Sequence, residues 1–169
     1  FDCPAVEAVF DVCEWLVSPA SAARTRRLVS GADLGLQPLS DAIEAADGDI
    51  ARIIDECDLS EAQGHVLDGL TVLRDRRGTF VSRPASTYVE DVIETLALRA
   101  DPYGFFPELG AAQRVANLDA LTETLAEWEG DDHLTPEELT ELVQPFRGSP
   151  YLGPNQPNTA DTGYDVEFR

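Results

Sequence analysis

Apolar residues recur at intervals of three and four positions along most of the chain, which is the spacing of one buried face of an α-helix. The first such stripe covers residues 4–18, and a second short helix is predicted over residues 20–30, where Gly31 follows. Two further short helices are predicted over residues 39–46 and 50–57. The N-terminal third of the chain is therefore expected to consist of helices joined by short turns.

Capping patterns predict where several of the later helices begin. Residues 60–63 read Ser-Glu-Ala-Gln, the form of a capping box, in which the side chains of the first and last residue each accept the other's backbone N–H. Residues 87–90 read Thr-Tyr-Val-Glu, which is a second sequence of this form. Thr135 precedes a proline and lies three residues before Glu138, which predicts a third capped helix start.

The longest helix is predicted over residues 108–129, where large apolar residues follow a near-heptad spacing. These are Leu118, Leu121, Leu125 and Trp128. Beyond residue 147 the composition changes, because the prolines and glycines between residues 148 and 163 cannot sustain a helix. The chain is therefore predicted to be all-α, with a compact bundle of about eight helices over residues 1–147 and an extended segment over residues 148–169.

The charge of the chain is strongly negative. Among 169 residues there are 32 Asp and Glu and 12 Arg, with no Lys, which gives a formal net charge of −20. The acids are spread along every segment, and such a surface suits molar salt, where the Debye length falls to about 3 Å and like-charge repulsion is screened. We therefore expect a salt-loving source, with an acidic decoy for a basic partner as the alternative. In a halophilic protein, acidity does not argue against nucleic-acid binding.

Several classes of protein are excluded or disfavoured by composition. The longest uncharged apolar run is far below the ~20 residues of a transmembrane helix, so no membrane partner is expected. The odd number of cysteines, Cys3, Cys13 and Cys57, without a CxxC pair favours buried thiols in a reducing, cytoplasmic compartment. The chain has no Met and starts at Phe1, from which we expect it to be a piece of a longer protein.

Candidate catalytic and metal-binding motifs are weak. Residues 127–138 resemble a calcium loop in their acids, but Asp132 stands where the turn requires glycine, which favours an acidic connection between helices. His65 and His133 lack a ligand at metal-site spacing, and His65 lies among apolar neighbours that favour a packing role. No phosphate-cradling loop, nucleophile elbow or HExxH sequence occurs. We therefore expect the chain itself to be no enzyme and to bind no cofactor or metal.

Two clusters of arginine remain as candidate binding residues. The first cluster is Arg24, Arg26 and Arg27. The second cluster, followed by a glycine-containing break and one more arginine, is Arg74, Arg76, Arg77 and Arg83. Arginines near a helix C-terminus complement the helix dipole, and this structural role is favoured for the first cluster. Phosphate contact weighs equally for the second cluster, so these four residues are the predicted DNA-binding set.

Residues 1–19, 22–30, 114–121 and 164–169 match a known family in order and spacing, and together they resemble parts of UvrD/Rep-like superfamily 1 DNA helicases. Residues 1–19 and 22–30 resemble the segment after helicase motif IV that leads into an inserted helical subdomain. Residues 114–121 are similar to the R-x-A-N-L-x-x-L helix of that insertion, and residues 164–169 are similar to the strand that leads into motif V. The resemblance covers the whole chain in the family's order and identifies it as a 2B-type helical insertion of the second RecA-like domain.

The resemblance implies a role in a larger enzyme. The parent chain would be an ATP-dependent DNA helicase of DNA repair or recombination, close to the UvrD/Rep and the helicase–exonuclease (AddA/RecB-like) branches. ATP and Mg would be bound by RecA-like motor domains of the same chain, outside these residues, and DNA would be the partner. The glycine turn that approaches duplex DNA in the family corresponds here to Gly31–Gly35, where Asp33 would repel phosphate.

A second interpretation is a free-standing, acidic α-helical module that binds a protein partner and has no role on DNA. The two interpretations differ in the sequence expected around the chain. A helicase insertion requires a Walker-type P-loop upstream and a Thr-Ile-His segment directly downstream of Arg169.

Overall fold

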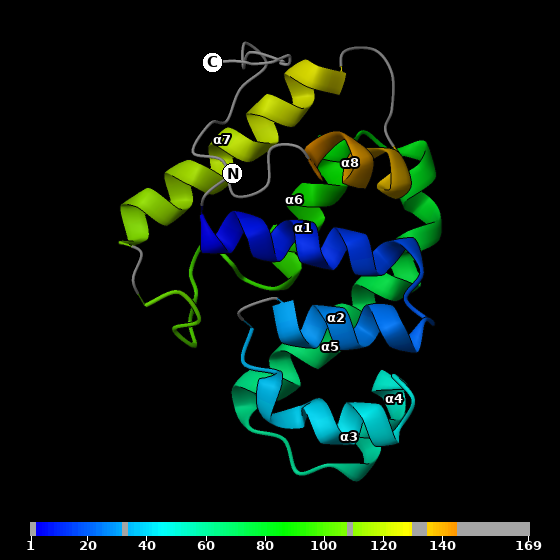
Figure 1. Ribbon diagram of the computed structural model, residues 1–169. Coiled ribbons are helices and arrows are strands. Elements are labelled where there is room, and N and C mark those ends of the chain that lie inside the picture. The colour runs from blue at the N-terminus through cyan, green and yellow to red at the C-terminus, as the bar shows by residue number, and fades with distance from the viewer. Residues whose placement is uncertain (1–2, 32–33, 108–109, 130–134, 145–169) are drawn as a thin grey trace.

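The protein, in a computed structural model, is described over residues 3–31, 34–107, 110–129 and 135–144, and within these ranges it consists of helices without a strand (Figure 1). The α-helices are α1 (Pro4–Val17), α2 (Ala22–Gly31), α3 (Ser40–Ala45), α4 (Ile50–Glu56), α5 (Glu61–Arg76), α6 (Ala85–Thr95), α7 (Ala111–Glu129) and α8 (Pro136–Val143). Two 3-10 helices, η1 (Gln37–Leu39) and η2 (Arg77–Ser82), precede α3 and follow α5. The all-α prediction is confirmed. The extended segment predicted over residues 148–169 lies outside the described residues.

Helix α1 is the central element of the core. Nine of its 14 residues are buried, so burial extends well beyond the single stripe predicted from the sequence. The reason is that α1 contacts four other helices, α2, α6, α7 and α8, which together cover most of its circumference. Figure 1 shows α1 running across the middle of the molecule, with α8 on one side and α2 on the other.

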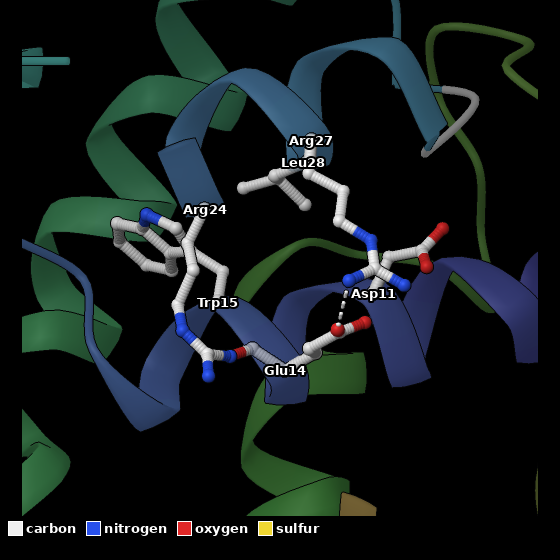
Figure 2. Close-up of a pocket in the computed structure, with 6 residues that line it drawn as sticks. All are labelled: Asp11, Glu14, Trp15, Arg24, Arg27 and Leu28. Carbon is white, nitrogen blue, oxygen red and sulfur yellow. Dashed lines mark hydrogen bonds and ion pairs between the residues drawn. The ribbon is translucent and has the colours of Figure 1, made fainter. Parts of the chain in front are cut away.

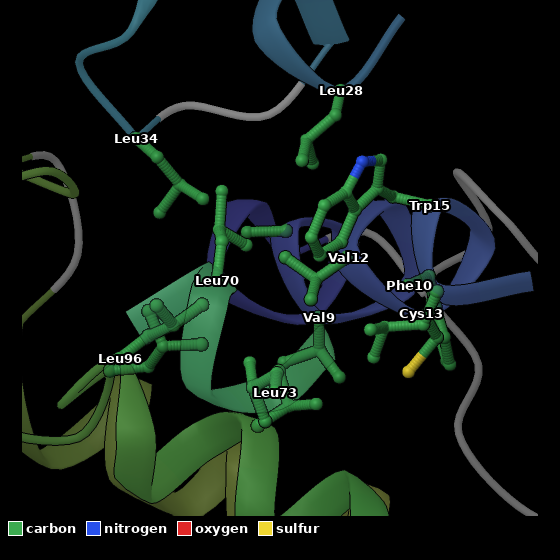
Figure 3. Close-up of a cluster of buried hydrophobic side chains, with 14 of the residues drawn as sticks. Val9, Phe10, Val12, Cys13, Trp15, Leu28, Leu34, Leu70, Leu73 and Leu96 are labelled. Atoms are coloured by element: carbon green, nitrogen blue, oxygen red, sulfur yellow. The ribbon is translucent and has the colours of Figure 1, made fainter. Parts of the chain in front are cut away.

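The packing of α2 on α1 combines apolar contact with a buried hydrogen bond. Trp15 of α1 is 1% exposed, and its indole Nε1 donates to Thr25 Oγ1 of α2 at 3.1 Å. Figure 2 shows Trp15 and Leu28 between the two helices. In Figure 3 the same leucine lies next to Trp15, and Leu70 and Leu73 of α5 extend this cluster.

Two of the three predicted capping boxes are confirmed. Ser60 Oγ accepts the N–H of Gln63 at 3.1 Å, and Gln63 Oε1 accepts the N–H of Ser60 at 3.0 Å. Thr135 and Glu138 exchange the same pair of hydrogen bonds, at 3.2 and 2.9 Å. These boxes depend on residues three apart, so the local sequence is sufficient to predict them.

The capping box predicted at residues 87–90 is wrong. Helix α6 begins two residues earlier, at Ala85, with Pro84 in the N-cap position and no side-chain cap from its own segment. The carboxylate of Glu129, at the end of α7, instead accepts the N–H of Ala85 at 2.6 Å. A side chain 44 positions away therefore satisfies one of the free amides of the first turn, and Thr87 lies within the helix.

The long helix α7 pairs with α6 and buries Leu118, Leu121 and Leu125 completely, as its near-heptad spacing predicted. It begins at Ala111, and the start predicted at residue 108 lies outside the described residues. The arginine of the R-x-A-N-L sequence, Arg114, is 6% exposed and donates to the carbonyl of Arg99 from both Nε and Nη2. It therefore holds the N-terminal part of α7 against the turn that follows α6.

A tight turn brings α2 close to the α3–α4 pair. Asp47 and Gly48 both have positive φ angles, 55° and 80°. A Cβ atom on Gly48 would lie 2.8 Å from the Cα of Ala22, in the first turn of α2. Glycine is therefore required at this position both by the backbone conformation and by the approach of α2.

The three cysteines differ in burial. Cys3 and Cys13 are buried as predicted, whereas Cys57 is only half-buried at the end of α4.

Within the described residues, every helix is too short or too polar to span a bilayer.

Candidate nucleic-acid interface

The C-terminal end of α1 brings one arginine of each cluster together. This helix has no basic residue in its own last turn, so its terminal carbonyls need partners from elsewhere. Arg77 donates from Nε to the carbonyl of Leu16 at 2.6 Å and from Nη2 to that of Val17 at 3.0 Å. Arg24 donates from Nη1 to the carbonyl of Glu14 at 2.9 Å. Arginines about 50 positions apart in the sequence therefore meet at one corner of the molecule, which we call the arginine corner.

The first cluster is largely used in packing. Arg27 Nη1 lies 2.8 Å from Glu14 Oε2, and Figure 2 shows this ion pair beside the Arg24 side chain on the surface of α1. The space enclosed by these residues is only about 10 Å³, which is too small for a ligand. Arg26 is exposed and lies against a separate hollow lined by Ile43 and Glu44. The dipole role predicted for the first cluster is wrong as stated, because none of its arginines lies in the last turn of α2. Arg24 instead bonds a carbonyl of α1, and Arg27 pairs with Glu14.

Arg77, from the predicted DNA-binding set, also acts on a helix end. Two of its donor atoms are taken up by carbonyls of α1, although it lies at the C-terminus of α5. The dipole argument from the sequence therefore applies to a different helix from the one that carries the residue. Arg77 is exposed as a whole, but its direct contribution to phosphate binding is limited by these two bonds.

Arg74 lies in a cleft of mixed charge. The cleft has a volume of about 390 Å³ and lies between the residues that follow α1 and the α3–α4 turn. Asp47 and Asp49 line it together with Arg74, which also lies 3.7 Å from its neighbour Asp75. Two carboxylates in the same cleft make Arg74 a weaker site for phosphate than its position in the cluster suggests.

Within the predicted DNA-binding set, Arg76 and Arg83 are the two residues whose guanidinium groups surround one anion, the carboxylate of Asp91. Arg76 Nη1 lies 3.0 Å from Asp91 Oδ1, and Arg83 Nη1 lies 3.4 Å from Asp91 Oδ2. The side chains of the two arginines are 50% and 33% exposed, whereas that of Asp91 is 18% exposed. Thr79 connects them, since its Oγ1 donates to the carbonyl of Arg76 at 2.8 Å and lies 3.5 Å from Arg83 Nη1. Two guanidinium groups and one carboxylate leave a net charge of +1 at this point.

Two stretches of the chain that contain no acid contribute arginines to the arginine corner. Residues 15–32 and residues 76–89 contain no Asp or Glu, although acids make up 32 of the 169 residues. The first of these stretches contains Arg24 and the second contains Arg77, and both residues cap α1. The structure thus brings the two acid-free arginine stretches to one corner. These gaps contradict the expectation that the acids are spread along every segment, and they are a signal in the sequence that no motif carries.

Two other arginines are fully engaged within the fold. Arg99 reaches Glu90 Oε1 from Nη2 at 2.8 Å, and the same nitrogen lies 2.9 Å from Asp119 Oδ1 on α7. The hydrogen bond from Arg99 is the main cause that holds the pKa of Glu90 below its usual range, and it raises the pKa of Arg99 itself. Arg99 and the buried Arg114 therefore join α6 to α7 and are poorly placed to bind DNA.

The described residues include His65 and the two ends of the calcium-like loop. His65 Nε2 lies 3.1 Å from the carbonyl of Leu96, and its ring packs against Tyr103 at a centroid distance of 5.3 Å, which agrees with the packing role. His133 and the middle of the calcium-like loop lie outside the described residues. Glu129, the third position of that loop, is buried and caps α6. Within the described ranges no group of three acidic, histidine or cysteine side chains could hold a metal ion.

Comparison with known proteins returns no relative: no protein-family model, no curated protein and no solved structure matches the chain. Within the described part of the chain, arginines from separate stretches meet at the arginine corner, and Arg76 and Arg83 meet at Asp91.

Proposed function

We propose that the chain is an accessory, regulatory helical subdomain of a cytoplasmic, ATP-dependent DNA helicase of the UvrD/Rep-like superfamily 1, active in DNA repair or recombination. The observation that carries the proposal is the pair of guanidinium groups of Arg76 and Arg83, which lie together around Asp91 in a strongly acidic chain. Under this proposal the RecA-like motor domains of the same protein bind ATP and Mg, and these residues contact the DNA that the motor moves.

The charges of the chain predict how such a contact operates. The net charge of −20 repels DNA from most of the surface, so a phosphate backbone is expected to be attracted where Arg76 and the half-buried Arg83 lie together. The isolated chain should therefore bind DNA weakly. A motor domain that already holds the DNA supplies a high local concentration, at which a weak contact is sufficient to influence unwinding.

The R-x-A-N-L helix supports the proposal in a different way. In this chain Arg114, Leu118 and Leu121 of that sequence are buried, and Arg114 ties α7 to the turn after α6. The matching residues thus act on the fold, not on DNA. The resemblance of this sequence to the helicase helix therefore concerns how the helices pack, and the proposal relies on it only for the architecture of the domain.

The proposal is tested first by unwinding assays on the protein that contains this chain. The double variant Arg76→Ala/Arg83→Ala should slow duplex unwinding and lower the dependence of DNA affinity on salt by about one unit of log–log slope per lost phosphate contact. The matched control is Arg52→Ala, which also removes an exposed arginine and its ion pair, with Glu56 of α4. Unwinding by the double variant at the rate of the Arg52→Ala control would contradict a DNA role.

The flanking coding sequence gives an independent test. A P-loop upstream and a Thr-Ile-His segment immediately after Arg169 are expected for a helicase insertion. Their absence would remove the motor from the proposal.

One observation favours the second candidate, an acidic module that binds a protein partner. Tyr103 is 36% exposed and its ring lies 5.3 Å from that of His65 and 6.1 Å from that of Phe105. Exposed aromatic groups of this kind are common at protein interfaces. If Tyr103→Ala weakens binding to a defined partner, while Arg76→Ala/Arg83→Ala leaves unwinding unchanged, the second candidate is the better description.

A further inference from the structure

We propose that Asp91 is a built-in competitor for DNA phosphate: its carboxylate holds Arg76 and Arg83 in the absence of DNA and is displaced when a phosphodiester binds between them. This inference rests on the proposed function and adds to it the regulation of the same site.

The first argument is the way in which the carboxylate is shared. Each oxygen of Asp91 contacts one arginine, Oδ1 with Arg76 at 3.0 Å and Oδ2 with Arg83 at 3.4 Å. Arg76 makes this contact through Nη1, and within the described residues its Nε and Nη2 have no further partner. The two guanidinium groups are thus already arranged around a single anion with two oxygens.

A phosphodiester fits the same arrangement. It carries one negative charge on two non-bridging oxygens, and arginine forks bind such oxygens in pairs. The two guanidinium groups alone carry a charge of +2. With the Asp91 carboxylate bound to them, the group carries only +1 and attracts a phosphodiester less strongly. The carboxylate therefore occupies guanidinium donors that a DNA phosphate needs, and lowers the affinity of the pair for any other anion.

The exposure of the three side chains makes exchange feasible. Ion pairs whose cations are 50% and 33% exposed are weak, because water screens them. Asp91, at 18%, is the more enclosed partner and belongs to α6, whereas Arg76 ends α5. The arginines can thus turn toward an incoming phosphate while Asp91 stays with its helix.

The backbone between the two arginines is held independently of Asp91. The hydroxyl of Thr79, in η2, donates to the carbonyl of Arg76, the last residue of α5, at 2.8 Å. Exchange of the carboxylate for a phosphate would therefore leave the backbone that follows Arg76 in place.

The experiment measures binding of a fluorescein-labelled 20-base-pair duplex to the 169-residue chain by anisotropy across a KCl series. Asp91→Asn should raise the affinity by roughly eightfold at 0.1 M salt and steepen the log–log salt slope by about 0.9, the effect of one additional phosphate contact. The matched control is Asp68→Asn, which removes one exposed acid from α5 without touching either arginine. Asp68→Asn lowers the long-range repulsion between the protein and DNA by the same amount as Asp91→Asn, but it should leave the log–log salt slope unchanged.

Two results would separate this inference from the function on which it rests. If Arg76→Ala/Arg83→Ala weakens DNA binding but Asp91→Asn behaves like Asp68→Asn, the competition by Asp91 is wrong and the DNA role remains. If neither the arginine variant nor Asp91→Asn changes binding, both proposals are wrong. In the combined variant Arg76→Ala/Asp91→Asn most of the gain should disappear, because the freed arginine is missing.

A measurement on the unmodified chain keeps the inference testable if Asp91→Asn fails to fold. The carbon-13 signal of the Asp91 carboxylate should move when duplex DNA is added, together with the side-chain NH signals of Arg76. Inorganic sulfate at matched ionic strength serves as the second arm. A shift with sulfate but none with DNA would overturn the assignment to nucleic acid, and an unmoved Asp91 signal at saturating DNA would overturn the competition.

Discussion

The chain contains arginine but no lysine. The planar guanidinium group of arginine allows one side chain to donate to two acceptors at once. Arg77 uses the fork on two successive carbonyls of α1, and Arg99 uses it to bridge carboxylates of α6 and α7. Arg114 directs two nitrogens to a single carbonyl. A lysine ammonium cannot reproduce these contacts, because its donors radiate from one point. The absence of lysine is thus matched by positions that require arginine geometry.

Replacing Arg77 with lysine should destabilise the protein although the charge is kept. The ammonium group can satisfy one carbonyl at the end of α1 but not both, and a hydrogen bond of a charged donor contributes about 1.5–3 kcal/mol. Because Arg77 is exposed, we expect a loss of about 1 kcal/mol in the free energy of unfolding, measured by urea titration at constant KCl. Arg52→Lys, at a surface ion pair, is the control and should change it by less than about 0.5 kcal/mol. Equal effects of the two changes would contradict the capping role.

Replacing Glu129 with alanine should loosen the start of α6. The change removes the acceptor of the buried Ala85 N–H, and leaving such a donor unsatisfied costs about 1–3 kcal/mol. Glu127→Ala, an exposed acid on the same helix, should have little effect in thermal unfolding. Gln at position 129 keeps an acceptor oxygen and should recover part of the loss. A melting temperature of Glu129→Ala equal to that of Glu127→Ala would argue against a cap supplied by α7.

At the scale of the element, most helices could be predicted because their signals are local. The apolar repeats of α1 and α7 and the capping boxes of α5 and α8 involve residues within a few turns of each other. The start of α6 could not be predicted in this way, since its cap comes from Glu129 at the far end of α7. Equally, the repeat in α1 predicts one buried face, and only the packing of four helices around it explains why most of its residues are buried.

The α6–α7 pair should respond to acid through Glu90. Its pKa is lowered in the folded protein by the hydrogen bond from Arg99, so the interaction stabilises the fold above the ordinary carboxyl pKa and is lost as the pH falls through the lowered value. Glu90→Gln should therefore unfold more easily than the unmodified chain at pH 7, and the difference should shrink as the pH falls toward 3. Unfolding curves at a series of pH values measure this. A difference that stays constant with pH would mean that the Glu90 carboxylate is not involved.

At the scale of the whole molecule, the tertiary fold determines which charged groups meet. The two arginine clusters were predicted from the sequence, and so was the possibility that they serve helix ends. Their meeting at α1 was not, because Arg77 and Leu16 are 61 residues apart and only the tertiary fold brings them into contact. The pairing of Arg76 and Arg83 with Asp91 was missed for the same reason, since helix spacing alone does not show which acid of α6 faces them.

The surplus of 20 negative charges should make folding depend on salt. Repulsion between exposed acids is screened as the Debye length shortens from about 10 Å at 0.1 M to about 3 Å at 1 M. The melting temperature should therefore rise as KCl increases from low to molar concentration, followed by circular dichroism. Sucrose solutions at the same osmolarity are the control for general exclusion effects. A melting temperature indifferent to KCl would contradict the halophilic interpretation.

The hydrogen bonds between Arg77 and the end of α1 have a mechanical consequence. A helix of 14 residues is about 21 Å long, and α1 connects the arginine corner to the helices that cover the middle of the molecule. A pull on the Arg77 side chain first loads its two hydrogen bonds to α1, and these pass the load to a helix that α2, α6, α7 and α8 hold in place. Because the two bonds are in series with the packed helices and weaker than their packing, a pull at this corner should separate Arg77 from α1 while the core stays intact.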